Sequence, residues 1–180
     1  MERRVHIVGL SGHGKTTLVK ELIPELTRRG LRVGSVKHTP HSYPIDQEGK
    51  DSRVHALAGA QPAAVICGAN AGIFLSATTQ SPDSEWWVTA LAPSYSSCDL
   101  VIVEGCKTAK TAPIIEVWNS ELAPQPLMVP GTCAIILRGE LPKDIPAPLP
   151  PSSSCSPWLG IIPRTDLSAI ADAVIKLSKL

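Results

Sequence analysis

The stretch from Gly9 to Thr16 constrains the fold of this chain more than any other part of its sequence. It reads Gly-Leu-Ser-Gly-His-Gly-Lys-Thr and fits the spacing G-x-x-x-x-G-K-[ST] without a mismatch. The run Val5–Val8 before it is mostly apolar and β-branched, and residues 17–23 after it place apolar side chains at helical spacing. A chance match in an ordinary turn would not need both flanking elements. The order of strand, glycine-rich turn and helix therefore predicts a loop that binds phosphate groups.

The residue types of this loop predict its chemistry. Gly9, Gly12 and Gly14 tolerate positive φ, so that successive backbone N–H groups and the N-terminus of the following helix can point at an anion. Lys15 is expected to reach the β- and γ-phosphates of a nucleotide, and the hydroxyl of Thr16 to ligate Mg²⁺. The loop residues predicted to contact the nucleotide are Gly9, Ser11, Gly12, His13, Gly14, Lys15, Thr16 and Thr17.

Length and composition exclude several classes of protein. The 180 residues suit one domain with a sizeable core, and 43% apolar and 18% charged residues indicate a globular chain. A net charge of +1 offers no electrostatic basis for binding nucleic acid or an anionic membrane. The sequence shows no signal-peptide pattern and no apolar run suited to spanning a membrane. We therefore expect a single cytoplasmic domain over residues 1–180.

The five cysteines are odd in number and scattered, and they include no C-x-x-C pair. This pattern argues against a zinc site and against a disulfide framework, and it favours reduced thiols. Cys106 lies next to a candidate catalytic segment, where either a reactive thiol or a small space-filling residue fits the sequence.

The rest of the chain predicts alternating helices and strands. A helix over 15–29 and a strand over 31–37 complete a βαβ unit, whose crossover makes its strands parallel. Apolar runs at 63–67 and 72–75 flank a Gly/Asn turn and predict an antiparallel hairpin. Other predicted elements are helices at 53–58 and 83–91, strands at 98–105, 114–118, 133–137 and 159–162, and a final helix capped by Asp166.

These elements together predict an α/β fold of the P-loop NTPase class. Its sheet is expected to be mostly parallel, twisted and flanked by helices, with the antiparallel hairpin as an addition. Residues 38–50 form a long polar loop of the kind that often serves as a lid. Residues 142–157 are rich in proline and serine and are expected to form a surface excursion.

Three acidic residues are candidates for catalysis. Glu104 ends the buried strand predicted at 98–105, as in a Walker B element, and can hold a metal-bound water or polarise the attacking water. Asp46 and Asp51 lie in or beside the lid and can hold a metal-bound water or orient the nucleophile. Asp51 can instead cap the following helix together with Ser52. The predicted metal ligands are Thr16, Glu104 and Asp46.

Basic residues follow the strand predicted at 31–37. Lys37 and His38 lie at its carboxyl end, where ligands bind in sheets of this kind, so both are predicted to contact the nucleotide. A hydrogen bond that caps the strand explains His38 equally well. Lys107 can pair with Glu104 or with phosphate, or it can be an ordinary surface lysine.

Several motifs together resemble the MobB family. They are Gly9–Thr17, L-I-P-E-L at 22–26, V-K-H-T-P-H at 36–41, G-K-D-S at 49–52, A-G-A at 58–60 and V-E-G-C-K at 103–107. The glycine-rich loop alone would indicate only a superfamily, whereas K-H-T-x-H and G-K-D-S in this order are far more specific. The similarity runs from about residue 3 to residue 118, and the closing strand and helix over 161–177 fit it as well.

This resemblance implies a dimeric P-loop protein of the signal-recognition and MinD-like class. Such a protein binds GTP with Mg²⁺, hydrolyses it weakly, and works as an adapter beside the guanylyltransferase MobA, which joins GMP to molybdopterin. The expected partners are therefore GTP, a MobA-type guanylyltransferase, molybdopterin or a molybdoenzyme apoprotein, and a second copy of the chain. The edge of the apolar hairpin at 63–77 can pair with that copy or be covered within the chain.

The sequence departs from the usual GTPase pattern in its base-reading motif and from the family pattern at two residues. The strand predicted at 133–137 is followed by Arg138-Gly139-Glu140 and shows no N-K-x-D motif, so the resemblance alone implies GTP rather than ATP. Glu140 is the acid that could replace the missing aspartate. Cys106 stands where MobB proteins usually have an aromatic residue, and Ile114 stands where they have lysine.

Two other functions are alternatives for a P-loop protein of this kind. A GTPase that inserts nickel would bring clusters of cysteine and histidine ligands, and His38 and His41 are the only close pair of histidines in the sequence. A small-molecule kinase would need an arginine-rich lid, and the segment 38–53 carries Lys50 and Arg53 but no run of arginines.

Overall fold

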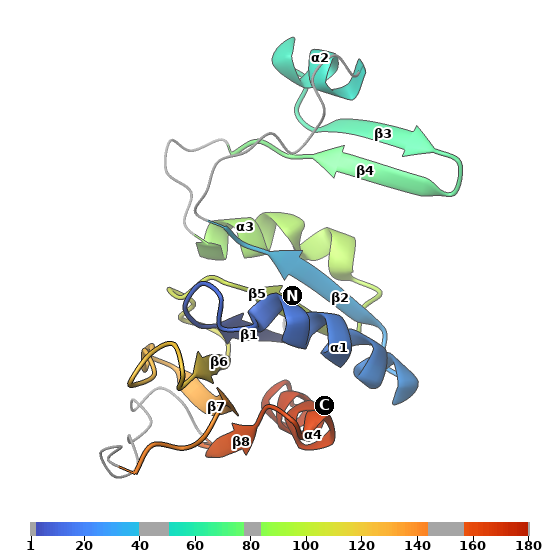
Figure 1. Ribbon diagram of the computed structural model, residues 1–180. Coiled ribbons are helices and arrows are strands. Elements are labelled where there is room, and N and C mark those ends of the chain that lie inside the picture. The colour runs from blue at the N-terminus through green and yellow to red at the C-terminus, as the bar shows by residue number, and fades with distance from the viewer. Residues whose placement is uncertain (1–2, 40–50, 78–83, 144–156, 180) are drawn as a thin grey trace. The chain divides into compact units, whose positions relative to one another are not determined.

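A computed structural model describes residues 3–39, 51–77, 84–143 and 157–179 (Figure 1). The chain divides into two compact units, one made of residues 1–39 and 84–180 and the other of residues 40–83. The larger unit contains the glycine-rich loop, and the smaller one contains the hairpin. The predicted lid residue Asp46 and most of the segment 142–157 lie outside the described residues.

The larger unit is built on a six-stranded sheet with the order β2-β5-β1-β6-β7-β8. All of its strand pairs are parallel, which confirms the predicted parallel sheet. The strands are β1 (Arg4–Val8), β2 (Val33–Lys37), β5 (Leu100–Glu104), β6 (Ile114–Asn119), β7 (Thr132–Arg138) and β8 (Ile161–Pro163). Because β1 lies between β5 and β6, its carboxyl end opens at a point where the chain order reverses, and ligands bind at such points.

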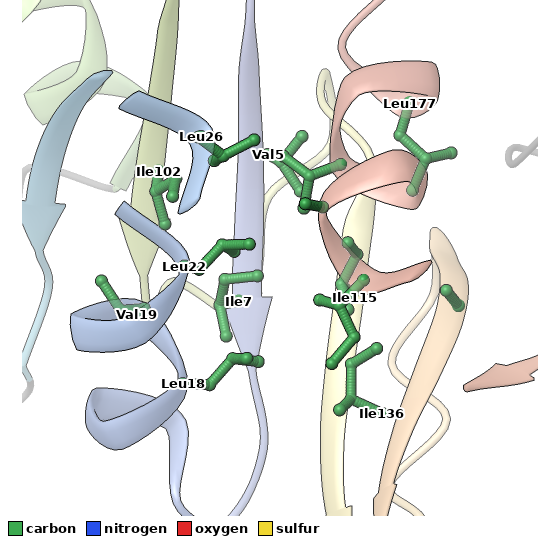
Figure 2. Packing of buried hydrophobic residues seen from close by; sticks show 14 of the residues in the cluster. Val5, Ile7, Leu18, Val19, Leu22, Leu26, Ile102, Ile115, Ile136 and Leu177 are labelled. Carbon is green, nitrogen blue, oxygen red and sulfur yellow. The ribbon is translucent and has the colours of Figure 1, made fainter. Parts of the chain in front are cut away.

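Side chains of the central strands alternate between two hydrophobic clusters. Val5 and Ile7 of β1 belong to the larger cluster, whereas Val8 belongs to a second one. This alternation follows from the two-residue period of a strand, and it buries both faces of the sheet. Figure 2 shows how the larger cluster fills the space between the sheet and the helices α1 (Lys15–Arg28) and α4 (Leu167–Leu177).

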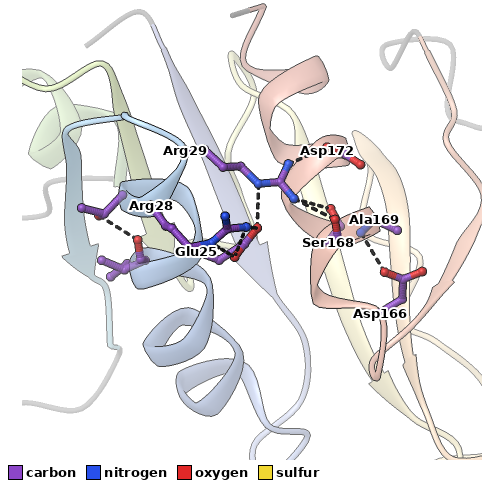
Figure 3. A network of polar contacts seen from close by, with 9 residues as sticks. Glu25, Arg28, Arg29, Asp166, Ser168, Ala169 and Asp172 are labelled. Carbon is purple, nitrogen blue, oxygen red and sulfur yellow. Dashed lines mark hydrogen bonds and ion pairs between the residues drawn. The ribbon is translucent and has the colours of Figure 1, made fainter.

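Helices α1 and α4 are also joined by charged residues. Arg29 binds Glu25 at 2.7 Å on its own helix end, and it reaches across to Asp172 and the Ser168 hydroxyl of α4 (Figure 3). Asp166 caps α4 as predicted, because its carboxylate accepts a hydrogen bond from the backbone N–H of Ala169 at 2.9 Å.

The remaining helical elements of the larger unit are α3 (Ser84–Leu91) and a 3₁₀ turn, Ala92–Tyr95, that the sequence did not predict. Tyr95 packs against the second cluster, and its hydroxyl donates to the carbonyl oxygen of Ser35 at 2.8 Å. Cys133 on β7 is disulfide-bonded, so the expectation of reduced thiols is wrong for this residue. Cys67, Cys98 and Cys106 are not disulfide-bonded.

The smaller unit contains the helix α2 (Asp51–Leu57) and the antiparallel strands β3 (Ala63–Cys67) and β4 (Asn70–Phe74). The predicted hairpin is confirmed, although β4 begins two residues before the predicted 72 because Asn70 pairs with Cys67. The helix also begins earlier than the predicted 53. The large exposed apolar side chains of the smaller unit are Val54, Leu57, Val65, Ile66 and Ile73.

Candidate functional site

The glycine-rich loop joins the end of β1 to the start of α1. Gly9, Gly12 and Gly14 have φ values of 146°, 78° and 93°, in the region that residues with a side chain rarely adopt. A β-carbon on Gly9 would collide with the carbonyl oxygen of Val117 on β6. The backbone therefore requires glycine where the sequence predicted it, and at Gly9 the packing requires it as well.

A pocket of about 310 Å³ lies over this loop. Its lining residues are Ser11, Gly12, Gly14, Lys15, Thr16, Thr17, Lys37 and Glu104, and all of them are among the residues predicted for the site. The ammonium group of Lys15 donates to the carbonyl oxygen of Leu10 at 2.6 Å. Lys15 thus lies across its own loop, at the pocket where the phosphates of a nucleotide would be held.

The far side of this pocket is made by Thr16, Lys37 and Glu104. The Thr16 hydroxyl donates to Glu104 Oε1 at 2.6 Å, and the same oxygen forms an ion pair with Lys37. Strand register explains the contact, because Glu104 at the end of β5 pairs with Lys37 on β2 and with Ile7 on β1. The structure therefore brings together three predicted site residues that are far apart in the sequence.

Two of these groups suit a magnesium ion. The Thr16 hydroxyl and the Glu104 carboxylate are oxygen donors, the type that Mg²⁺ prefers, and they already lie within hydrogen-bond distance of each other. The Glu104 side chain is only 6% exposed, whereas that of Lys37 is 51% exposed and can turn away from it. The donor set therefore fits Mg²⁺ bound with a phosphate group.

The electrostatic balance of the pocket favours an anion. Burial lowers the pKa of Lys15, the carboxylate of Glu104 opposes this shift, and the positive charges of Lys37 and Lys107 reinforce it. Three ammonium groups and one carboxylate thus act on the same space. A polyanion such as a triphosphate would relieve the repulsion among the lysines.

His13 has a different position from the other loop residues. Its side chain is 4% exposed, and its Nδ1 accepts a hydrogen bond from the backbone N–H of Asn119 at 3.2 Å. Burial lowers its pKa, the backbone of Val117 opposes the shift, and Lys15 reinforces it. His13 therefore fastens the loop to the end of β6 as a neutral imidazole.

A buried acid that the sequence analysis did not select organises the segment after β6. Glu116 is 1% exposed, and its two carboxylate oxygens accept hydrogen bonds from the backbone N–H groups of Leu127 and Met128. Burial raises its pKa, and these hydrogen bonds oppose the shift. The only signal in the sequence is a charged residue inside an otherwise buried strand.

A second pocket, of about 380 Å³, adjoins the phosphate pocket and shares Gly14 and Thr17 with it. Its other lining residues are His13, Leu137, Arg138, Gly139, Pro163, Arg164 and Thr165. They come from the carboxyl ends of β7 and β8 and from the residues that follow them. In this region the sequence suggested a role only for Glu140, and it gives no signal for residues 163–165.

The other predicted site residues have varied positions. The backbone N–H of His38 donates to the carbonyl oxygen of Glu104 at 2.8 Å, a bond that does not involve the imidazole. Asp51 is the first residue of α2 in the smaller unit, and Asp46 and His41 lie outside the described residues. Cys106 is buried in the second hydrophobic cluster, and Lys107 is exposed.

Comparisons with known proteins agree with this arrangement. The model of the family described as "MobB: Molybdopterin guanine dinucleotide synthesis protein B" matches residues 4–137. The molybdopterin-guanine dinucleotide biosynthesis adapter protein of Escherichia coli K12 is 37% identical over 105 residues, which is 58% of this chain and 59% of that protein. The protein of the same name from Haemophilus influenzae is 32% identical over 140 residues, 78% of this chain and 66% of its own length. The chain thus spans less than two thirds of these relatives' length.

Solved structures show the same fold. The crystal structure of Bacillus subtilis MobB superimposes with a TM-score of 0.65 and 24% identity, over 97% of each chain. A MobB homologue from Bacillus stearothermophilus gives a TM-score of 0.58 and 20% identity, over 99% of each chain. The predicted P-loop NTPase type of fold is therefore confirmed. Because the family match covers most of the sequence, this chain belongs to the MobB family.

Proposed function

We propose that this protein is a GTP-binding adapter that assists a MobA-type guanylyltransferase in attaching GMP to molybdopterin. The observation that carries the proposal is the convergence of the glycine-rich loop, Thr16, Lys37 and Glu104 on one pocket. Membership of the MobB family and the names of the curated relatives, which are adapter proteins of this pathway, support it.

Each group at the pocket has a role in this proposal. The backbone N–H groups of the loop and the ammonium group of Lys15 bind the phosphates. Thr16 and Glu104 would hold Mg²⁺, which would supply positive charge beside the phosphates. Lys37 leaves the carboxylate of Glu104 and turns to the γ-phosphate, because its side chain is half exposed and starts beside Thr16.

The same arrangement would support the weak hydrolysis of GTP that the proposal includes. Glu104 is the one carboxylate among the described residues that line the phosphate pocket, and it would orient the attacking water by accepting a hydrogen bond from it. Asp46 and Asp51 are further candidates for orienting that water, on the basis of the sequence. Slow hydrolysis suits an adapter, in which the bound nucleotide controls docking to the partner enzyme.

The alternative functions have less support. Among the residues that the structure describes, no group of three or more His, Cys, Asp or Glu side chains could hold a metal ion, so nothing there favours nickel insertion. The family match also favours an adapter over a small-molecule kinase. None of the helices in the described ranges is long and apolar enough to cross a membrane. As a separate part of the proposal, the protein acts in the cytoplasm beside its proposed partners.

The adapter is proposed to act as a homodimer. The smaller unit exposes several large apolar side chains, among them Ile66 at 82%, Ile73 at 59% and Leu57 at 76% exposure. A two-stranded hairpin is also marginal by itself and gains stability when another strand or surface covers it. Light scattering of the wild type and of Ile66→Lys tests this point: the wild type is expected to be a dimer, and the variant to contain more monomer.

A reconstituted reaction tests the proposed function. A MobA-type guanylyltransferase, molybdopterin, GTP and Mg²⁺ are mixed with and without this protein, and the product that carries GMP is measured over time. We expect faster or more complete product formation with the wild type and no effect of Lys15→Ala. Equal progress with and without the wild type, under conditions where it binds GTP, would refute the adapter role.

A further inference from the structure

The second pocket has the position that the base of a bound nucleotide would need. It shares Gly14 and Thr17 with the phosphate pocket, so a ligand whose phosphates lie in one pocket can extend directly into the other. Its volume of about 380 Å³ is in the range of ordinary small-molecule sites. Leu137 and Pro163 supply apolar surface for the faces of a flat ring.

The charged side chains of this pocket are donors only. Two arginines line it, and a guanidinium group carries five N–H donors and no acceptor. None of the described residues that line it has a carboxylate or a side-chain amide. The pocket therefore suits a base edge made of acceptors and lacks the carboxylate that would read the N1 and N2 donors of guanine.

Arg138 is better placed than Arg164 to read the base. The Arg164 guanidinium forms an ion pair at 2.9 Å with Glu21 on α1, and this contact holds it beside that helix. The Nη1 atom of Arg138 lies 3.7 Å from the position that a β-carbon on Gly14 would take, so its guanidinium group lies beside the phosphate loop.

Hydrogen bonds from Ser120 fix the main chain of Arg138. Its carbonyl oxygen accepts hydrogen bonds from the backbone N–H of Ser120 at 3.0 Å and from the Ser120 hydroxyl at 3.2 Å. Gly139 has a φ of 87°, and a β-carbon there would lie 2.5 Å from the Ser120 hydroxyl oxygen. The segment is thus fixed while the arginine side chain remains exposed to the pocket.

We infer that the base lies in this second pocket and that Arg138 selects guanine through its O6 and N7 acceptors, without a carboxylate that reads N1 and N2. The inference rests on the proposed binding of GTP and adds how the base is chosen. Guanine presents two acceptors on this edge, whereas adenine presents an amino donor beside N7, which faces a guanidinium donor unfavourably. Hypoxanthine, the base of ITP, keeps O6 and N7 and lacks only the N2 amino group of guanine.

A calorimetric panel of GTP, ITP and ATP with Mg²⁺ tests the inference. We expect ITP to bind within about threefold of GTP, and ATP to bind roughly tenfold to a hundredfold more weakly, the discrimination of one bidentate contact. In Arg138→Ala the difference between GTP and ATP should shrink to about threefold or less. Arg138→Lys keeps the positive charge and loses the paired donors, and it should also lose the discrimination. Arg28→Ala, an exposed arginine on α1, is the matched control and should leave all three affinities unchanged.

Each contrary outcome has a separate meaning. Much weaker binding of ITP than of GTP would overturn the inference, because the base would then be read at N2, and Glu140→Gln would show whether Glu140 reads it. An equal loss for all three nucleotides in Arg138→Ala would also overturn it, since Arg138 would then act on the phosphates or the sugar. In both cases the proposed GTP binding survives. Failure of the wild type to bind any of the three would refute the proposed function itself, and the inference with it.

Discussion

Replacing His13 by alanine should destabilise the phosphate loop, because it removes the contact between this loop and the end of β6. The imidazole is buried, and its Nδ1 accepts the backbone N–H of Asn119, a residue that is itself 3% exposed. Without the acceptor, this buried donor has lost its partner, which costs about 1–3 kcal/mol. The lost burial of the ring adds about 1 kcal/mol. The expected loss in the free energy of unfolding is therefore about 2–4 kcal/mol.

The matched variant is His13→Asn, whose amide oxygen can accept the same hydrogen bond. It should lose about 1 kcal/mol or less, because it restores the acceptor and gives up only part of the ring volume. Urea unfolding followed by tryptophan fluorescence measures both variants, since Trp118 is fully buried next to this region. Equal stability of His13→Ala and wild type would refute the claim that His13 holds the loop.

The pH dependence of stability supplies an independent check. The folded state lowers the pKa of His13, so the unfolded state binds a proton more readily. This contribution to stability is complete above the pKa of an unfolded histidine, about 6.5. It is lost as the pH falls below that value toward the folded pKa. The wild type should therefore lose more stability than His13→Asn between pH 7 and pH 5, and identical losses would contradict the assignment of a neutral buried imidazole.

Three further predictions concern the pocket and the core. Glu104→Gln keeps an acceptor for Thr16 and loses the charge, so GTP should still bind while single-turnover hydrolysis slows by about a hundredfold or more; an unchanged rate would remove Glu104 from the reaction. Burial lowers the pKa of Lys15, so as the pH rises this lysine should lose its proton earlier than an ordinary lysine, and the affinity for GTP should fall with it. An affinity that stays constant over that rise in pH would argue against a contact between Lys15 and phosphate. Leu22 is fully buried between α1 and the sheet, and Leu22→Ala should cost about 2–5 kcal/mol by chemical denaturation; a loss well under 1 kcal/mol would contradict this packing.

The parts of the fold that the sequence predicted are those set by local patterns. The glycine spacing located the loop, the apolar run before Glu104 located β5, and Asp166 with the periodic residues after it located α4. The βαβ pattern predicted parallel strands, and the sequence placed Lys37 and Glu104 each at the carboxyl end of a strand. Only the structure shows that these two strands are neighbours. In each case, residues close in the sequence determine the structure.

The parts that escaped prediction depend on contacts between distant segments. His13 meets Asn119 across 106 residues of sequence, and the role of Glu116 depends on backbone that returns 11 and 12 residues later. Arg138 reaches Gly14 only because β7 lies two strands from β1 in the sheet. A single sequence shows these side chains but not their neighbours.

Calorimetric titration of the wild type and of Lys15→Ala with GTP and Mg²⁺ tests most directly whether residues 9–16 hold a triphosphate. We expect one nucleotide per chain for the wild type, and a loss of affinity of about a hundredfold or more for the variant, because a charge-assisted contact to phosphate is removed. Circular dichroism should show the same secondary structure and unfolding transition for both proteins. Equal affinity of the two proteins for GTP, with both folded, would contradict the nucleotide site.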